Sequence, residues 1–296
     1  MPVEISSPQF KIGFSAETGG SVTHLKFFNG TDFVDIFRPA NPMAIAANDP
    51  LSMGNFPLFP FSNRIAEGRF TVDNKEHVLP TNMPPEPHSI HGISWQRPAI
   101  LIEQSKTYIK ISHNQNSDDY PFQFAATQEW RILNDHEIEI YLRLTNTGNH
   151  IMPFGMGIHP YFVRTPKATI KAKTDNVILN DDRMIPVSVS KIPEQFNFNS
   201  ARIVNDMQMD NCFTGWNGEC TLSWAEFNTE LTLKADKIFG NLVVYIPEGQ
   251  DFYCLEPVSN INDAVNNSLS LSNTGLVYLK PSESMDGKIL LSFKTF

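Results

Sequence analysis

A strict alternation of polar and apolar residues in the middle of the chain restricts the possible folds more than any other feature. It extends over residues 122–145, and Glu137 to Leu144 reads Glu-Ile-Glu-Ile-Tyr-Leu-Arg-Leu. Side chains that alternate with a period of two lie on opposite faces of a β-strand. Strands with one apolar and one polar face are typical of antiparallel sheets. The sequence therefore predicts long antiparallel strands in this region.

Shorter alternating stretches on both sides predict further strands, and turn-forming residues separate them. We expect these strands at 9–14, 22–28, 33–37, 69–72, 77–79, 100–112, 168–172, 177–179, 220–224, 230–234, 241–246 and 252–256, with a closing hairpin at 275–280 and 288–293. Helical periodicity is scarce: residues 261–267 could form one or two turns, and residues 39–65 read as a proline-rich ordered loop or irregular strand. No repeat or linker divides the chain. We predict an all-β fold, with residues 1–296 forming one large, mostly antiparallel β-sandwich domain.

Charge and composition exclude several classes of partner. The net charge is -9 and no Lys/Arg-rich run is present, so we expect no nucleic-acid binding. No run of about eighteen apolar residues occurs, and the N-terminus lacks a basic segment followed by an apolar one, so we expect a cytoplasmic protein without a membrane partner. Three cysteines are too few for a disulfide framework and are not spaced as zinc ligands, which favours reduced thiols.

The stretch from Pro153 to Phe162 brackets His159 with glycines, prolines and aromatic rings. Proline has no N–H for a strand ladder and glycine allows close approach, so this segment is not an ordinary strand interior. An imidazole held there suits a general acid or base, although a core histidine that stiffens a bend is the alternative. Glu256 stands at the end of an apolar strand, where burial would raise its pKa toward that of a useful base. A carboxylate in solvent is the alternative for that residue.

Other isolated ionisable groups lie in loops rich in proline and aromatic residues. Arg64 needs a partner there, either a core carboxylate or a ligand. His88 and His91 are three residues apart, but this spacing in a loop is weak evidence for a metal site and no third ligand stands at a diagnostic distance. We expect no metal. Asp210 precedes aromatic residues in the least regular part of the chain.

Together these elements resemble the aldose 1-epimerase (galactose mutarotase) family, and the likeness covers almost the whole chain. The matching elements are Pro60-Phe61-Ser62-Asn63-Arg64-Ile65 with Gly68-Arg69-Phe70, His91-Gly92, Gly157-Ile158-His159-Pro160-Tyr161-Phe162, Asp210, and Glu256-Pro257. The resemblance implies a galactose mutarotase-like β-supersandwich with the sugar in a cleft on one sheet. It also implies an enzyme that interconverts the α and β anomers of a free aldose without a cofactor.

The resemblance implies a role for each matching residue. Glu256 would be the general base that removes the proton of the anomeric hydroxyl, and His159 the general acid that protonates the ring oxygen. The residues implied to bind the sugar are Asn63, Arg64, His91 and Asp210, although Asp206 could take the place of Asp210. Ring opening needs one proton removed and one delivered at adjacent oxygens, which a Glu/His pair can do. The productive enzyme would carry a protonated imidazole and an ionised carboxylate.

Three other functions stay open at this stage. A hexose-phosphate mutarotase of the same fold would need several cations, whereas Arg64 is the prominent one. A glycoside hydrolase would use Asp210 and Glu256 as its carboxylate pair and leave His159 without a role. A non-catalytic carbohydrate-binding protein would stack sugars on Trp95, Trp216 and Phe rings. The oligomeric state, monomer or homodimer, is also open.

Overall fold

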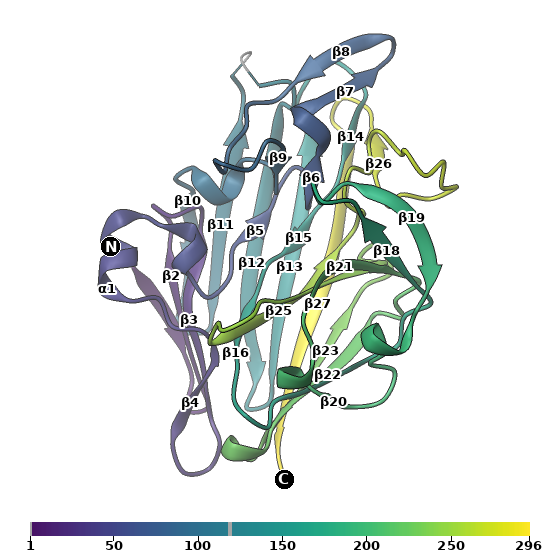
Figure 1. Ribbon diagram of the computed structural model, residues 1–296. Coiled ribbons are helices and arrows are strands. Elements are labelled where there is room, and N and C mark those ends of the chain that lie inside the picture. Colours follow the sequence, from purple (N-terminus) through teal and green to yellow (C-terminus); the bar gives the residue numbers. More distant parts are fainter. Residues whose placement is uncertain (1, 118–119) are drawn as a thin grey trace.

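The computed structural model describes residues 2–117 and 120–296, and two large antiparallel sheets dominate it (Figure 1). The larger sheet has the strand order β1-β2-β3-β4-β16-β25-β24-β21-β18-β19, and β15 pairs beside this path with both β25 and β5. Its strands are β1 (Val3–Ser6), β2 (Phe10–Ser15), β3 (Ser21–Phe28), β4 (Phe33–Phe37), β5 (Pro57–Leu58), β15 (Gly157–Ile158), β16 (Tyr161–Val163), β18 (Asn176–Asn180), β19 (Pro186–Lys191), β21 (Met209–Thr214), β24 (Asn241–Ile246) and β25 (Phe252–Val258).

The second sheet contains the long alternating strands that the sequence predicts, in the order β10-β11-β12-β13-β27-β23-β22-β17-β20. Its strands are β10 (Ile100–Gln104), β11 (Tyr108–Gln115), β12 (Phe124–Asn134), β13 (Glu137–Asn146), β17 (Thr169–Ala172), β20 (Arg202–Ile203), β22 (Glu219–Trp224), β23 (Thr229–Ala235) and β27 (Ser284–Thr295). Every strand pair in both sheets is antiparallel among the residues described, in agreement with the predicted fold class.

Small elements connect and cover the sheets. Three two-stranded pairs are β6 (Arg64–Ile65) with β9 (Ser89–Ile90), β7 (Arg69–Val72) with β8 (Lys75–Val78), and β14 (Met152–Phe154) with β26 (Val277–Leu279). The helices are α1 (Pro42–Ala47) and the 3₁₀ turns η1 (Pro50–Ser52), η2 (Ala66–Gly68), η3 (Ser94–Gln96), η4 (Glu194–Phe196), η5 (Val204–Asp206) and η6 (Ala225–Phe227). In the described part of the chain, no helix has the length and apolar character needed to cross a membrane.

The main core lies between the two large sheets, and aromatic rings join them. Phe10 and Phe27 of the larger sheet lie 5.2 and 5.0 Å from the ring of Phe293 in the other sheet. Phe14 contacts Trp130 across the same interface, with the ring centres 5.6 Å apart. Burial of each such ring contributes about 1.5–3 kcal/mol, so these contacts fix one sheet on the other.

A second apolar cluster covers the opposite face of the larger sheet. It contains Phe56, Leu58, Ile90, Trp95, Tyr161, Ile178, Cys212, Val243, Phe252, Cys254, Val258, Ile261 and Ala264. All seven residues of β25 are buried, because this strand has the main core on one face and the second cluster on the other. We call this second face of the larger sheet the outer face.

The helix α1 lies within the passage predicted to be an ordered loop or irregular strand, so that prediction was incomplete. Asn41 accepts a hydrogen bond from the N–H of Ala44, and Pro42 occupies the first turn. Asn48 ends the helix in the left-handed region, at φ 51°. Six residues are too few to show a helical period, and the capping residues were the available signal.

Two strand predictions were wrong, one in the extent of the strand and one in its pairing. The stretch from Ile100 to Ser112 is not one strand, because the chain turns between β10 and β11, where the N–H of Ser105 donates to the carbonyl of Tyr108. The last two predicted strands do not form a hairpin, since β26 pairs with β14 while β27 lies between β13 and β23. Alternation identifies a strand but does not identify its partner. The strands β1, β19 and β21 are among those that were not predicted.

Candidate active site

The alternation of β25 turns Glu256 away from the main core. Tyr253 and Leu255 belong to the core between the sheets, and Cys254 belongs to the outer cluster. Successive side chains of a strand point to opposite faces, so Glu256 shares the outer face with Cys254. The structure places Glu256 within the strand, where the sequence analysis expected the strand end, and its exposed fraction is 2 %.

His159 reaches the same face because the short strand β15 passes very close to β25. Gly157 pairs with Val258, and a Cβ atom at Gly157 would lie 2.7 Å from the carbonyl oxygen of Pro257. Only glycine fits at that distance. The backbone N–H of His159 then donates to the carbonyl of Phe56 at 3.0 Å. The unusual glycine and proline content of this stretch therefore serves the close approach of His159 to β25.

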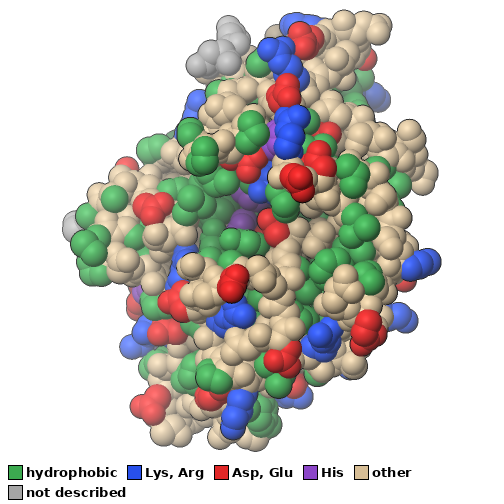
Figure 2. All heavy atoms as spheres, viewed as in Figure 1, with side chains coloured by type: hydrophobic (Ala, Val, Ile, Leu, Met, Phe, Trp, Pro, Cys, Tyr) green, Lys and Arg blue, Asp and Glu red, His purple; other side chains and the backbone are tan. Residues whose placement is uncertain are grey.

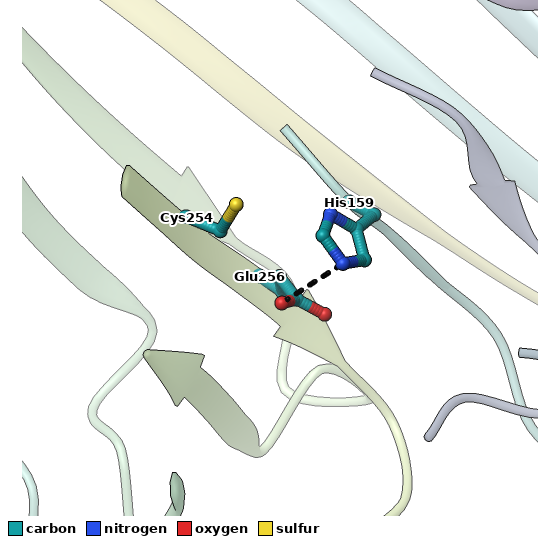
Figure 3. Close-up of side chains that lie close together, drawn as sticks. All are labelled: His159, Cys254 and Glu256. Atoms are coloured by element: carbon teal, nitrogen blue, oxygen red, sulfur yellow. Dashed lines mark ion pairs between the residues drawn. The ribbon is translucent and has the colours of Figure 1, made fainter. Parts of the chain in front are cut away.

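His159 and Glu256 are in direct contact (Figure 3). The Nε2 atom of His159 lies 3.4 Å from Oε1 of Glu256, and both side chains are buried. The imidazole ring lies between two aromatic neighbours, with its centre 4.6 Å from that of Phe56 and 4.7 Å from that of Tyr161. These rings hold the imidazole in one orientation toward the carboxylate.

Each member of this pair also has a buried polar atom without a partner among the described residues. These atoms are Nδ1 of His159 and Oε2 of Glu256. Buried polar side-chain atoms are nearly always hydrogen-bonded, and leaving one unpaired costs about 1–3 kcal/mol. Such atoms mark a place where a ligand or a transferred proton can supply the missing interaction.

Burial shifts the two pKa values in opposite directions. It lowers the pKa of His159 to about 3, and the nearby guanidinium of Arg38 also lowers it. Burial raises the pKa of Glu256 well above its ordinary value, the charge of Asp210 adds to this effect and Arg64 opposes it. The free pair therefore favours neutral imidazole and protonated carboxyl. The charged pair predicted from the sequence holds the same single proton and differs only by its transfer across the 3.4 Å contact.

His91 lies beside this pair in a fixed protonation state. Its backbone is left-handed, at φ 61°, and its ring centre is 5.1 Å from that of His159. The Nδ1 atom accepts a hydrogen bond from the N–H of Asn63 at 3.2 Å. The hydrogen of the neutral ring is therefore on Nε2, which can donate to a ligand. Burial lowers the pKa of His91 well below its ordinary value, and His159 and Arg64 add to this shift, so the ring stays neutral.

Arg64 is held beside His91 by the pairing of β6 with β9. Its Nε donates to Oε2 of Glu86 at 3.3 Å, and its Nη1 donates to Oδ1 of Asn63 at 3.4 Å. The same Asn63 oxygen accepts the backbone N–H of Arg64. Glu86 and Asn63 engage only some of the guanidinium N–H groups, which leaves donors for a ligand. Asn63 thus positions both Arg64 and His91, and its predicted role in binding the sugar stays a prediction.

The sheet register places Asp210 on the outer face. Asp210 lies opposite Tyr245, Tyr245 lies opposite Cys254, and Glu256 is two residues further along the same face. Two strand spacings are about 10 Å, so Asp210 and the Glu256 strand can flank a ligand whose floor is Tyr245 and Val243. Burial raises the pKa of Asp210, Arg64 lowers it and Glu86 raises it. Asp206 is exposed in η5, which favours Asp210 as the carboxylate of this site.

His88 does not belong to the site. Its Nδ1 accepts the backbone N–H of Glu67 at 3.0 Å, and its Nε2 lies 2.9 Å from the carbonyl oxygen of Arg183. Both ring nitrogens are engaged with the backbone, so His88 and His91 do not form a metal-binding pair.

The space-filling view shows a hollow on this side of the molecule, with histidine side chains at its bottom, apolar side chains around them and charged groups near its rim (Figure 2). Several residues of the site were missed by sequence reasoning. Tyr161 stood in the matching motif but received no role, although the guanidinium of Arg38 lies 4.2 Å from its ring centre. Glu86, the partner of Arg64, stands among prolines, and no motif in the sequence marks it.

Comparison with known proteins gives a match to one family over nearly the whole chain. The sequence model of the family described as Aldose 1-epimerase matches residues 3–292. The Escherichia coli K12 protein YphB, which has no characterised function, is 24 % identical over 268 residues, which is 88 % of this chain and 89 % of YphB. Galactose mutarotase of Rattus norvegicus is 27 % identical over 139 residues, but this covers only 45 % of the chain and 38 % of that enzyme.

Solved structures show the same fold. A galactose mutarotase-like protein from Clostridium acetobutylicum has a TM-score of 0.87 at 20 % identity, with 100 % of this chain and 95 % of that chain covered. A protein from Escherichia coli K12 has a TM-score of 0.89 at 22 % identity, with 100 % and 99 % covered. The chain therefore has the galactose mutarotase-like fold.

Proposed function

Because this chain belongs to the aldose 1-epimerase family, we propose that it interconverts the α and β anomers of a free aldose at the Glu256–His159 pair. The observation that carries the proposal is the contact between Nε2 of His159 and Oε1 of Glu256, with one unpartnered atom on each residue. A base and an acid in contact are what the reaction needs, since its two protons move at neighbouring oxygens.

In the proposed reaction the carboxylate of Glu256 removes the proton of the anomeric hydroxyl while His159 protonates the ring oxygen. The bond between C1 and the ring oxygen breaks and the carbonyl at C1 forms. Rotation about the C1–C2 bond presents the other carbonyl face, and the same two groups then act in reverse to close the ring. The pair starts with one proton, so His159 must carry it when the sugar is bound. A hydroxyl donating to Glu256 stabilises its ionised form and favours that transfer.

The remaining side chains supply binding. Neutral His91 donates through Nε2, Arg64 offers the guanidinium hydrogens that Glu86 and Asn63 leave free, and Asp210 accepts from a hydroxyl. Charged groups that hydrogen-bond a sugar hydroxyl contribute about 1.5–3 kcal/mol each. His91 packs against His159, and Arg64 and Asp210 are close enough to Glu256 to shift its pKa, which supports a role in orienting the sugar.

The alternatives explain fewer of these observations. A sugar-binding module would stack its ligand on tryptophan, but Trp95 and Trp216 are buried, with exposed fractions of 1 % and 6 %. A phosphate would need several free cations, whereas Arg64 is paired with Glu86 and the Nη2 atom of Arg38 donates to the carbonyls of Leu51 and Met53. Glycoside hydrolysis gives no task to His159.

The test is the rate of mutarotation. We expect the protein to accelerate the change in optical rotation of freshly dissolved α-glucose or α-galactose, with proton NMR to identify the anomers. The Glu256→Gln variant keeps the shape of the side chain but cannot accept the proton, so its turnover should fall by about 10²–10⁴-fold while affinity changes little.

Two results would contradict the proposal. Saturable shifts in the NMR spectrum without acceleration would indicate a binding protein. Release of a reducing sugar from a glycoside would indicate hydrolysis.

A further inference from the structure

A thiol completes a group of three metal-ligating side chains at the His159–Glu256 contact. Cys254 precedes Glu256 by two residues and therefore projects from the same face of β25. His159, Cys254 and Glu256 each offer one ligand atom, and these atoms all lie within 4.8 Å of one another (Figure 3). The proton-transfer chemistry proposed above gives Cys254 no task.

We propose that His159, Cys254 and Glu256 form a binding site for a thiophilic divalent cation, Zn²⁺ in particular, whose occupation blocks the acid–base pair. The inhibition rests on the proposed function, whereas the binding of the metal does not. The sequence led us to expect no metal, and this site departs from that expectation. Turnover would still need no metal, because the metal in this site would be an inhibitor.

The donor set fits zinc. Imidazole nitrogen, thiolate sulfur and carboxylate oxygen are its usual protein ligands, at about 2.0–2.3 Å from the metal. The three ligand atoms lie within 4.8 Å of one another, so the side chains would have to close by about 1 Å to reach tetrahedral geometry. A water from the cleft would take the fourth position. On binding, the thiol proton and the single proton of the pair pass to solvent. The thiolate and the carboxylate then balance the double charge of the cation, which suits a buried site.

The unpartnered atoms of the pair are an independent indication of a ligand. Nδ1 of His159 and Oε2 of Glu256 are buried and have no hydrogen-bond partner among the described residues. Besides the atom that contacts the other residue, each side chain therefore has a second polar atom that lacks a hydrogen bond. A bound cation with a coordinated water would engage the imidazole and the carboxylate together. It would also occupy the lone pairs that the reaction uses, so sugar turnover and metal binding should exclude each other.

The experiment combines inhibition with a signal that does not depend on activity. Zn²⁺ is titrated against mutarotation in the full-length protein, and EDTA is then added. We expect inhibition by Zn²⁺ that EDTA reverses, and no loss of activity when EDTA is added to metal-free protein. Co²⁺ replaces Zn²⁺ in a second titration, because a thiolate bound to Co²⁺ gives a charge-transfer band in the near ultraviolet.

Substitution of the thiol separates this site from other metal binding. In Cys254→Ala, and in Cys254→Ser in case alanine impairs folding, the half-inhibiting Zn²⁺ concentration should rise by at least about tenfold, since loss even of a group that only supports a metal ligand costs this much. Basal turnover should be nearly unchanged and the Co²⁺ band should disappear. Cys220→Ala is the matched control, because Cys220 is equally buried but belongs to the main core. This variant should keep both the inhibition by Zn²⁺ and the Co²⁺ band of the unmodified protein.

Two results would overturn the site: absence of the Co²⁺ band in the unmodified protein, or its persistence in the folded Cys254 variants. A Co²⁺ band that depends on Cys254, in a protein that does not accelerate mutarotation, would support the metal site and refute the proposed function.

Discussion

His159 and Glu256 share one proton, and this sharing determines the expected response to pH. At low pH the pair gains a second proton and at high pH it loses its only one, so kcat/KM should be bell-shaped. Burial lowers the pKa of His159 to about 3 and raises that of Glu256, which moves the two limbs apart and widens the plateau between them. The limbs belong to the coupled pair and not to either residue alone. Measurement of kcat/KM from acid to alkaline pH checks this shape.

Replacement of His159 by Asn should change the profile in a specific way. Asn keeps a hydrogen-bond donor but has no proton to transfer, so turnover should fall by about 10²–10⁴-fold. The remaining base works only when Glu256 is ionised, and its pKa is raised by burial. The activity of the variant should therefore rise with pH through that raised pKa and show no alkaline decline.

The matched control is His91→Asn. His91 is neutral and is held by the N–H of Asn63, so its loss should mainly raise KM and leave both limbs in place. An alkaline limb that persists in His159→Asn and is lost in His91→Asn would assign the acid to His91.

Among single residues, the sequence singled out Glu256 and His159 but not their surroundings. Glu256 and His159 could be selected because each stands in a short motif with proline or glycine. Their contact, the aromatic rings of Phe56 and Tyr161 on the imidazole, and the thiol of Cys254 all depend on strands that pair across the chain. Tautomers also depend on geometry, since only the N–H of Asn63 shows which nitrogen of His91 carries hydrogen.

Among the elements, the narrow gap between β15 and β25 is the most sensitive point. In Gly157→Ala the new methyl group would lie 2.7 Å from the carbonyl oxygen of Pro257 and push β15 away from β25. We expect a loss of stability of about 1–3 kcal/mol and a lower kcat, because His159 moves with β15. Thermal or urea unfolding together with mutarotation rates measures both effects.

Gly240→Ala is the control for that substitution. The nearest atom to its added methyl group would be the carbonyl oxygen of Lys237 at 3.5 Å, an ordinary contact distance. This variant should differ little from the unmodified protein. If kcat fell equally in both variants, the loss in Gly157→Ala could not be attributed to a displacement of His159 with β15.

The strands that alternate clearly were predicted well, and those that depend on distant partners were not. The predicted strand at 241–246 matches β24, and β4 matches the prediction at 33–37. The hairpin predicted at the end of the chain was wrong, because β27 fills the space between β13 and β23. The local sequence indicates which residues form strands, while the packing of the whole sheet decides which strands pair with each other.

At the scale of the whole molecule, the stability of the sandwich and the chemistry of the outer face are separable. Phe293 packs against Phe10 and Phe27 between the sheets, on the side of the larger sheet opposite to the site. Phe293→Ala should lower the free energy of unfolding by about 3–5 kcal/mol while the KM for sugar stays unchanged below the melting transition.

Phe296→Ala is the control at the same end of the chain. Phe296 is 61 % exposed and should contribute little to stability. A changed KM in Phe293→Ala at a temperature where the protein is folded would show that the two faces of the larger sheet are coupled.

The burial of β25 on both faces has a consequence for how this strand tolerates variation. In a library that replaces each of its positions in turn, the positions that lower cellular abundance should differ from those that lower the catalytic rate. Polar replacements at Tyr253 and Leu255 should deplete the folded protein and leave the specific activity of the survivors intact. Replacement of Glu256 should leave abundance intact and abolish the rate. Alternate positions along β25 would then be constrained by folding on one face and by catalysis on the other.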